Sequence, residues 1–201
     1  SGLDEKYGRE IEESNWTIWR KEEEMNYTKF TEKELKELLN SLVILVDTRE
    51  QANGHITDYF KSKKVNFRSE KLDTGDYSVM IPANQDLGIL RDIYLKVLVE
   101  RKNSIDELAS SIKAERFENE LIRSQESRLT LVVEDKFQTL ILGQYRSEYS
   151  ATALLARLKS FEARYGFTTV FMDKVSIGEY IRSHLYYYAR AYLKGYLKGT
   201  N

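Results

Sequence analysis

The chain has no cysteine among its 201 residues, only two histidines and a single proline, Pro82. The lack of cysteine excludes disulfides and thiolate metal sites, and two histidines are too few for a histidine zinc site. Any bound metal would therefore be held by carboxylates, which favours hard cations such as Mg²⁺ or Mn²⁺. No apolar run approaches the length needed to cross a bilayer, so we expect no membrane partner and an intracellular location.

The chain also lacks a strong charge imbalance. Its formal net charge is −1, which alone does not indicate a nucleic-acid partner, although a local basic patch matters more than the total. No proline-rich or serine-rich linker divides the sequence, and hydrophobic residues make up 41% of it, enough for a real core. We expect a polar, partly helical arm over residues 1–41 and one domain over residues 42–201.

Apolar runs typical of buried strands alternate with stretches that have the periodicity of amphipathic helices. The expected strands cover residues 42–47, 67–73, 76–81, 93–100, 129–135 and 168–172. The expected helices cover residues 31–42, 56–64, 104–112, 115–127, 152–165 and 177–197. Thr31 and Glu34 form a capping-box pattern at the first of these helices. This alternation predicts an α/β fold in which helices flank a mixed sheet.

Charged residues gather where three of the expected strands begin or end. In chain order they are Asp47, Arg49, Glu50, Asp76, Glu100, Arg101, Lys102 and Asp106. Ligands of α/β sheets tend to bind at strand ends and in the adjoining loops. Because side chains alternate along a strand, Glu100 and Lys102 should share one face. We expect neighbouring strands to bring Asp76 and Glu100 together.

These residue types suit phosphodiester hydrolysis. Two or three carboxylates can hold one or two divalent cations, which lower the pKa of bound water and shield the charge that grows on phosphorus. Lys102 would position or activate the attacking water or stabilise the pentavalent state, and Arg49 and Arg101 can grip phosphate oxygens. Each cluster alone is more often a solvated strand end or a helix cap. Asp106, for example, also suits the first turn of the helix that Ser104 opens.

Three stretches resemble the motifs of a known nuclease family. "VDTRE", "TGDYSV" and "VERKNSIDEL" match V-D-x-R-E, G-D-Y and E-R-K-x-x-x-D of the nuclease domain of the XPF family of structure-specific DNA endonucleases. The likeness continues through "RFENEL" and "LTLVVED" and covers residues 42–190. It implies a restriction-endonuclease-like fold and Mg²⁺- or Mn²⁺-dependent cutting of branched, flapped or forked DNA in repair, recombination or replication.

The resemblance also implies a role for each matching residue. Asp76 and Glu100 would be the main metal ligands, and Lys102 would be the catalytic lysine. Asp47 and Asp106 would be further acidic ligands of the metal. Asp47 and Arg101 would also be catalytic residues, and Arg49 and Glu50 would surround the site. Members of the family usually pair as dimers and carry a helix-hairpin-helix domain that binds duplex DNA. We therefore expect a homodimer. Because the sequence shows no clear helix-hairpin-helix motif, three alternatives stay open: the module was removed, a partner supplies the DNA contacts, or the chain is a minimal nuclease from a small replicon such as a phage.

The last expected helix combines basic residues with tyrosines. Arg182, Arg190, Lys194 and Lys198 interleave with six tyrosines, and no acidic residue follows Glu179. Such a stretch could follow a DNA backbone and stack on unpaired bases. Packing of the tyrosines on the core is the commoner role of an aromatic stripe on a helix, and dimerisation is a third alternative.

Two other functions compete with the endonuclease. A non-catalytic DNA-binding or scaffolding subunit of a nuclease complex would keep the fold, but this reading predicts loss of Asp76, Glu100 or Lys102, and the chain keeps all three. A different nuclease of the same broad fold, such as a restriction or recombination enzyme, would share the metal site and differ only in its substrate.

Overall fold

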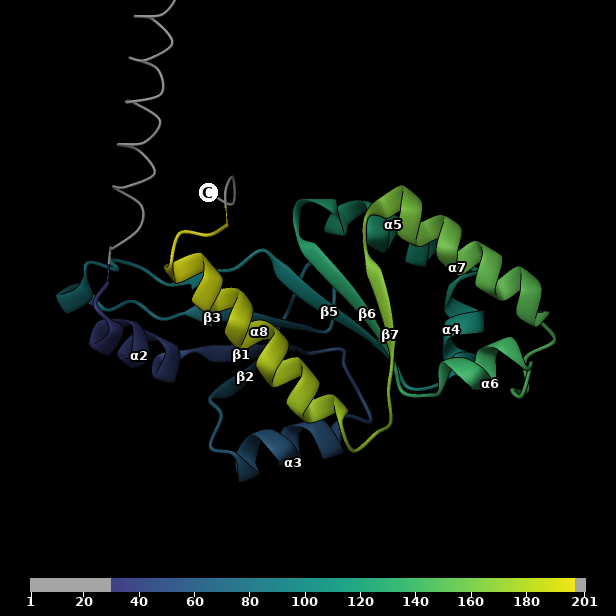
Figure 1. The fold of residues 1–201 in the computed structure, drawn as a ribbon, viewed down its shortest axis with the longest axis horizontal. Helices are drawn as coiled ribbons and strands as arrows, with labels where there is room; N and C mark the ends of the chain where they lie inside the picture. Colours follow the sequence, from purple (N-terminus) through teal and green to yellow (C-terminus); the bar gives the residue numbers. More distant parts are fainter. Residues whose placement is uncertain (1–29, 198–201) are drawn as a thin grey trace, which may run out of the picture.

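A mixed β-sheet forms the centre of the structure, a computed structural model that describes residues 30–197 (Figure 1). Its strands are β1 (Val43–Asp47), β2 (Phe67–Glu70), β3 (Tyr77–Ile81), β4 (Ile93–Tyr94), β5 (Val97–Lys102), β6 (Arg128–Val133) and β7 (Thr168–Phe171). Their order across the sheet is β2-β1-β3-β5-β6-β7, and β4 pairs with β3. β3 is antiparallel to β1 and β5, whereas the pairs β1–β2, β5–β6 and β6–β7 are parallel.

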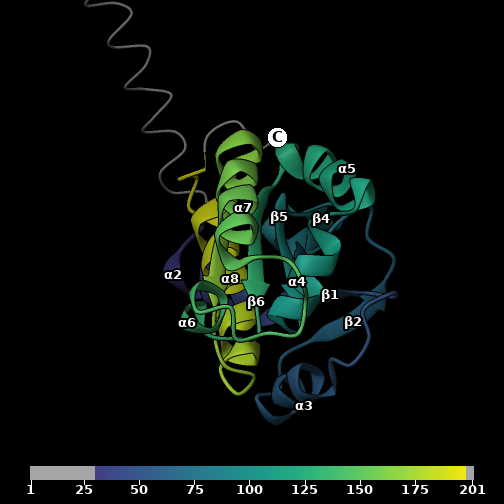
Figure 2. The ribbon, with the colours of Figure 1, turned by 90° about the vertical axis from the view of Figure 1, so that its right-hand side faces the viewer.

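Helices cover both faces of this sheet (Figure 2). One hydrophobic core joins the sheet to α2 (Glu32–Ser41), α3 (Gly54–Ser62) and α8 (Ile177–Leu193). A second core joins it to α4 (Ile105–Ser111), α5 (Glu115–Arg123), α6 (Phe137–Ile141) and α7 (Ala151–Tyr165). Within β5, Val97 and Val99 belong to the first core and Leu98 to the second, as the alternation of a strand requires. Short 3-10 helices, η1 (Gln85–Leu87) and η2 (Ser124–Glu126), lie in the connections.

The helix α2 belongs to the core, although we expected residues 1–41 to form an arm. The Glu34 amide donates to Thr31 Oγ1 and the Thr31 amide donates to the Glu34 carboxylate, so the expected capping box is present. Leu35, Leu38 and Leu39 are buried against the first core, which also contains α8. Residues 1–29, with Trp16 and Trp19, and residues 198–201 lie outside the described residues.

The segment 93–100, expected as one strand ending at Glu100, forms two strands instead. β4 pairs with the end of β3, the regular pairing stops at residues 95 and 96, and β5 then pairs with β3 at Val99 and with β6 as far as Lys102. Glu100, Arg101 and Lys102 therefore lie inside a strand, and their side chains point to alternating faces. The strands β2 and β3 follow one another in the chain but do not pair, because they flank β1 on its two sides.

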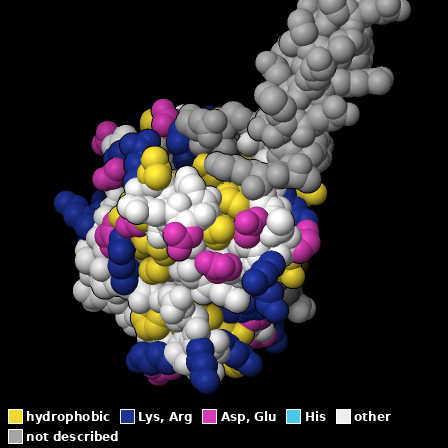
Figure 3. Space-filling model, turned by 90° about the vertical axis from the view of Figure 1, so that its left-hand side faces the viewer, with side chains coloured by type: hydrophobic (Ala, Val, Ile, Leu, Met, Phe, Trp, Pro, Cys, Tyr) yellow, Lys and Arg dark blue, Asp and Glu magenta, His cyan; other side chains and the backbone are white. Residues whose placement is uncertain are grey.

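The surface seen in Figure 3 carries charges of both signs. Lys and Arg side chains, Asp and Glu side chains and hydrophobic side chains are interspersed over the described residues of this face. This mixture agrees with the small net charge of the sequence. Among the described helices, none is both long enough and apolar enough to cross a membrane.

Candidate active site

A cavity of about 320 Å³ opens between the sheet and the helices α4 and α5. Seven acidic and four basic residues line it, and most of them come from the clusters that the sequence indicates. The acidic residues are Asp47, Glu50, Asp73, Asp76, Glu100, Glu107 and Glu120. The basic residues are Arg49, Arg101, Lys102 and Arg116.

The backbone around β3 and β5 brings Asp76 and Glu100 to this cavity. Tyr77 pairs with Val99 in the ladder, and the Asp76 amide donates to the Val99 carbonyl at 2.9 Å. The Arg101 amide in turn donates to Asp76 Oδ2 at 2.7 Å, which fixes the Asp76 side chain beside the strand. Gly75 permits this turn, because its φ is 77° and a Cβ there would lie 3.2 Å from the Cβ of Leu98.

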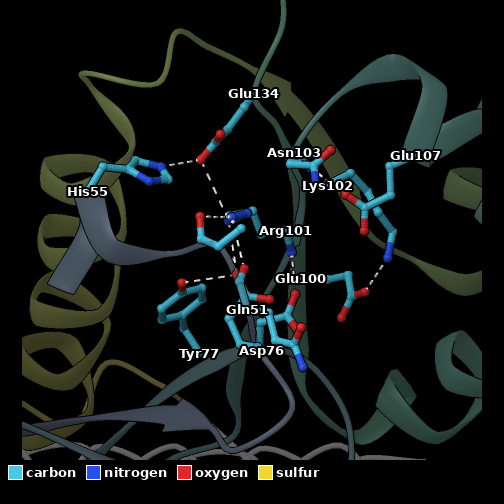
Figure 4. A network of polar contacts seen from close by, with 12 residues as sticks. Gln51, His55, Asp76, Tyr77, Glu100, Arg101, Lys102, Asn103, Glu107 and Glu134 are labelled. Carbon is cyan, nitrogen blue, oxygen red and sulfur yellow. Dashed lines mark hydrogen bonds and ion pairs between the residues drawn. The ribbon is translucent and has the colours of Figure 1, made fainter.

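Glu100 and Lys102 share one face of β5, as their spacing predicts. Lys102 Nζ donates to Glu100 Oε1 at 2.6 Å, and both side chains are buried. Lys102 Nζ also lies 5.2 Å from the centre of the Phe117 ring, which α5 presents to the cavity. The ammonium group therefore lies between a carboxylate and an aromatic ring at the side of the cavity. Figure 4 shows its hydrogen bond to Glu100.

The carboxyl groups of the cavity repel one another. Burial, together with the charges of Glu100 and Glu50, raises the pKa of Asp76 to about 8. Burial also raises the pKa of Glu100, although Lys102 partly opposes this effect. Burial alone would lower the pKa of Lys102, but the carboxylates of Glu100 and Asp76 outweigh it and raise the pKa. The site therefore favours a bound positive charge and keeps Lys102 in its ammonium form.

Asp47 binds Arg49 instead of facing the cavity with a free carboxylate. Its two oxygens accept from Nε and Nη2 of Arg49 at 2.8 and 3.0 Å and from the amides of Arg49 and Leu72 at 2.7 Å. Burial would raise the pKa of Asp47, but these hydrogen bonds lower it below its ordinary value. Half of the Arg49 side chain is exposed, at 51%, so Asp47 positions an arginine at the edge of the cavity.

Arg101 points to the opposite side of β5 from Glu100 and Lys102 (Figure 4). Its guanidinium is buried, with Nε 3.0 Å from Glu50 Oε1 and 3.6 Å from Glu134 Oε1. Nη2 donates to the Ala52 carbonyl at 3.0 Å. The structure thus does not place the Arg101 guanidinium where it could grip a phosphate.

Glu134 is a member of this network that our reading of the sequence missed. It follows β6 directly, and its carboxylate lies 2.6 Å from Nε2 of His55 as well as near Arg101. Burial raises the pKa of Glu50, the other carboxylate of the network, to about 6, although Arg101 partly opposes this. The signal was present in "LTLVVED", an apolar run that ends at an acidic residue like the three clusters singled out.

Asp106 is not brought to the cavity. It lies in the first turn of α4, where Oδ1 accepts from the amides of Arg146 and Ser147 at 2.9 and 2.8 Å. Its side chain therefore anchors the loop before α7. Asp106 follows β5 by only four residues, but in the first turn of α4 its side chain points toward Arg146 and Ser147 and away from Glu100.

The basic residues of the last helix lie on α8 and just beyond it. Arg182 pairs with Glu179 at 2.6 Å and Lys194 with Glu32 at 3.0 Å, whereas Lys198 lies outside the described residues. Tyr188 is buried, and the partly buried members Tyr180, Tyr186 and Tyr192 pack against the first core. These contacts favour packing for four of the six tyrosines, whereas Tyr187 and Tyr196 are exposed. DNA binding by Arg182, Arg190, Lys194 and Lys198 stays a prediction.

The donor set of the cavity fits a divalent cation with oxygen ligands. Among the described residues no three His, Asp or Glu side chains form a complete metal cage. Mg²⁺, however, usually binds through one or two carboxylates and keeps several waters. Asp76 and Glu100 supply two buried carboxylates, and burial is the main cause that raises the pKa of each. A hydrated Mg²⁺ or Mn²⁺ therefore fits these two residues.

Comparisons with known proteins agree with this geometry. The model of the ERCC4 domain matches residues 46–181. The fold is similar to XPF from Aeropyrum pernix, solved alone and in complex with DNA, with a TM-score of 0.55 and 22% sequence identity in each case. Each match covers 74% of this chain and 65% of that chain. No curated protein sequence gives a significant match. The expected restriction-endonuclease-like fold is thus confirmed, and the chain belongs to the ERCC4-domain family.

Proposed function

We propose that the chain is a divalent-metal-dependent endonuclease that hydrolyses phosphodiester bonds in DNA. The observation that carries this proposal is the meeting of Asp76 and Glu100 in one cavity, with Lys102 Nζ 2.6 Å from Glu100. Two carboxylates and a lysine at the ends of adjoining strands are what metal-assisted attack of water on a phosphodiester needs. Membership of the ERCC4-domain family supports the same reaction.

In this proposal Asp76 and Glu100 hold Mg²⁺ or Mn²⁺. The bound metal would lower the pKa of a water and neutralise the charge that develops on the phosphate. The cavity's own residues orient the reactants: the Arg101 amide fixes Asp76, and Phe117 and Glu100 fix Lys102. A water oxygen would form the new bond to phosphorus and lose its proton to solvent, while one bond from phosphorus to a sugar oxygen breaks and that oxygen takes up a proton from solvent.

Lys102 acts in this scheme as a positive donor and not as a general base. The raised pKa keeps its amine protonated at neutral pH, so it has no lone pair to accept a proton. Its charge and N–H groups can orient the attacking water and stabilise a phosphate oxygen in the transition state. Arg49, positioned by Asp47, has its Nη1 group without a hydrogen bond inside the described part of the chain and can grip a neighbouring phosphate.

We further propose that the substrate is branched, flapped or forked DNA and that the protein works as a homodimer. The complex of XPF from Aeropyrum pernix with DNA supports DNA as the ligand. This chain spans 65% of the length of that protein. In this proposal a DNA-binding partner holds the duplex while the cavity acts on the strand. Roles in DNA repair, recombination or replication follow from the same substrate class.

The test is cleavage of labelled flap, fork, four-way junction and plain duplex DNA with Mg²⁺, Mn²⁺ or EDTA. We expect metal-dependent cuts near the junction, and Glu100→Gln should abolish them because a neutral amide is a poor ligand for a hard cation. Glu126→Gln is the matched control, since Glu126 is exposed and does not line the cavity. Normal cutting by Glu100→Gln would show that the reaction does not use this site.

A further inference from the structure

Arg116 occupies a position on α5 that helix stability does not explain. It is the second residue of the helix, where the positive end of the helix dipole disfavours a cation. Its ion pair with Glu120 runs from arginine to glutamate in the N- to C-terminal direction, the weaker orientation for an i,i+4 pair. The Arg116 side chain is 78% exposed, and exposed pairs contribute little to stability.

The same helix is tied closely to the reactive residues. Phe117, the residue after Arg116, contacts Lys102, and the Glu120 carbonyl accepts from Thr74 Oγ1 at 3.3 Å, two residues before Asp76. Arg116 and Glu120 both line the cavity. The charge of Glu120 also raises the pKa of Glu100 and of Arg49, so this pair lies close to both the carboxylates and the arginine at the edge of the cavity.

Arg116 differs from Arg101 and Lys102 because its guanidinium keeps N–H groups that can donate to a ligand. Within the described residues only Nε is engaged, by Glu120 Oε1 at 3.0 Å, so both terminal nitrogens keep their N–H donors. Arg101 is buried in its own network and Lys102 is held by Glu100. A cavity with seven acidic and four basic residues repels an approaching phosphate. Cations that reach out of it are therefore needed to bring a phosphodiester in.

We propose that Arg116 binds a phosphate of the DNA next to the scissile bond, while Glu120 positions its guanidinium through Nε. Arg116 from α5 and Arg49 from the loop after β1 would then hold the strand from two edges of the cavity. This inference rests on the proposed function, since it assigns a substrate contact to the same site. Arg116 is a binding residue in this scheme, and Glu120 is a positioning residue.

The test compares Arg116→Ala with Arg123→Ala, which removes an equal charge from the exposed far end of the same helix, outside the cavity. Binding is measured in a Glu100→Gln background with labelled flap DNA over a salt series, and KM and kcat are measured with active protein. For Arg116→Ala we expect binding about tenfold weaker, a salt slope smaller by about one and a raised KM with nearly unchanged kcat. Arg116→Lys should keep the salt slope but lose part of the affinity, because a lysine lacks the planar fork.

The two proposals fail in different ways. If the parent protein cuts DNA but Arg116→Ala binds with unchanged affinity and salt slope, the role of Arg116 is refuted and the nuclease stands. Equal losses in Arg116→Ala and Arg123→Ala would also refute it, because net charge would then explain both. A folded parent protein that neither binds nor cuts any of the DNA substrates would overturn the proposed function and this inference together.

Discussion

The charge repulsion in the cavity predicts that Asp76→Asn stabilises the metal-free protein at high pH. The pKa of Asp76 is about 8 in the fold and 3.8 ordinarily, so the folded state binds this proton more tightly than the unfolded state. Between these two values the free energy of unfolding must therefore fall as the pH rises. An asparagine does not titrate, and it can still accept the hydrogen bond from the Arg101 amide. The variant should lack this loss of stability.

The size of the effect follows from the same two values. At about 1.4 kcal/mol for each pH unit, ionising Asp76 inside the fold costs up to about 6 kcal/mol. Relaxation of the surroundings and water in the open cavity reduce such costs, so we expect about 2–3 kcal/mol in practice. The parent and Asp76→Asn proteins should have similar stability near pH 4, and the variant should be more stable by this amount near pH 9.

The assay is chemical denaturation of both proteins in EDTA at several values of pH. The difference between the two curves reports the ionisation of Asp76 together with its repulsion of Glu100 and Glu50, because titrating groups that do not interact with Asp76 contribute equally to both. Addition of Mg²⁺ at pH 9 should then stabilise the parent protein but not the variant, since a ligand that binds only the folded state raises its stability. A difference that does not change with pH, or a variant that is less stable at pH 9, would refute the proposed repulsion.

Two further predictions separate residues that the sequence groups together. Asp106→Asn should leave the cleavage rate unchanged, because Asp106 binds the loop at Arg146 and not the cavity; a loss as large as that of Glu100→Gln in the same cleavage assay would contradict this placement. Arg101→Met should lower the free energy of unfolding by about 3–5 kcal/mol, since it leaves Glu50 and other buried acceptors without their cation. Chemical denaturation measures this change, and a loss below about 1 kcal/mol, the range of an exposed pair, would show that the network is not structural.

The sequence predicts the centre of the site because that centre depends on strand geometry. Alternation along β5 places Glu100 and Lys102 on one face whatever the rest of the fold does, and the structure has them 2.6 Å apart. The meeting of Asp76 and Glu100 needs only that β3 and β5 adjoin. The same periodicities predict most helices and strands, because a buried strand and an amphipathic helix have distinct patterns of apolar residues.

The periphery of the site depends on directions that spacing does not specify. Asp106 follows β5 by one helical turn, but its side chain points to a loop forty residues later in the chain. Glu134 contacts Arg101 only because β6 lies beside β5, and it contacts His55 only because α3 begins near the end of β6. The break at residues 95 and 96 likewise arises from a shift of the register against β3, from Met80 opposite Tyr94 to Tyr77 opposite Val99, which apolar periodicity in a single segment does not reveal.

Because side chains alternate along β5, the three residues of Glu-Arg-Lys have different roles. Glu100 and Lys102 face the cavity, and Arg101 faces a buried network that joins the loop after β1 to the end of β6. That loop carries Arg49, and the amide of Arg101 itself fixes Asp76. A substitution of Arg101 would therefore disturb the reactive residues without its guanidinium touching the substrate. An Arg101 variant should therefore lose activity without a change in the salt dependence of DNA binding. A residue that contacts a phosphate, as proposed for Arg116, should change that salt dependence when it is replaced.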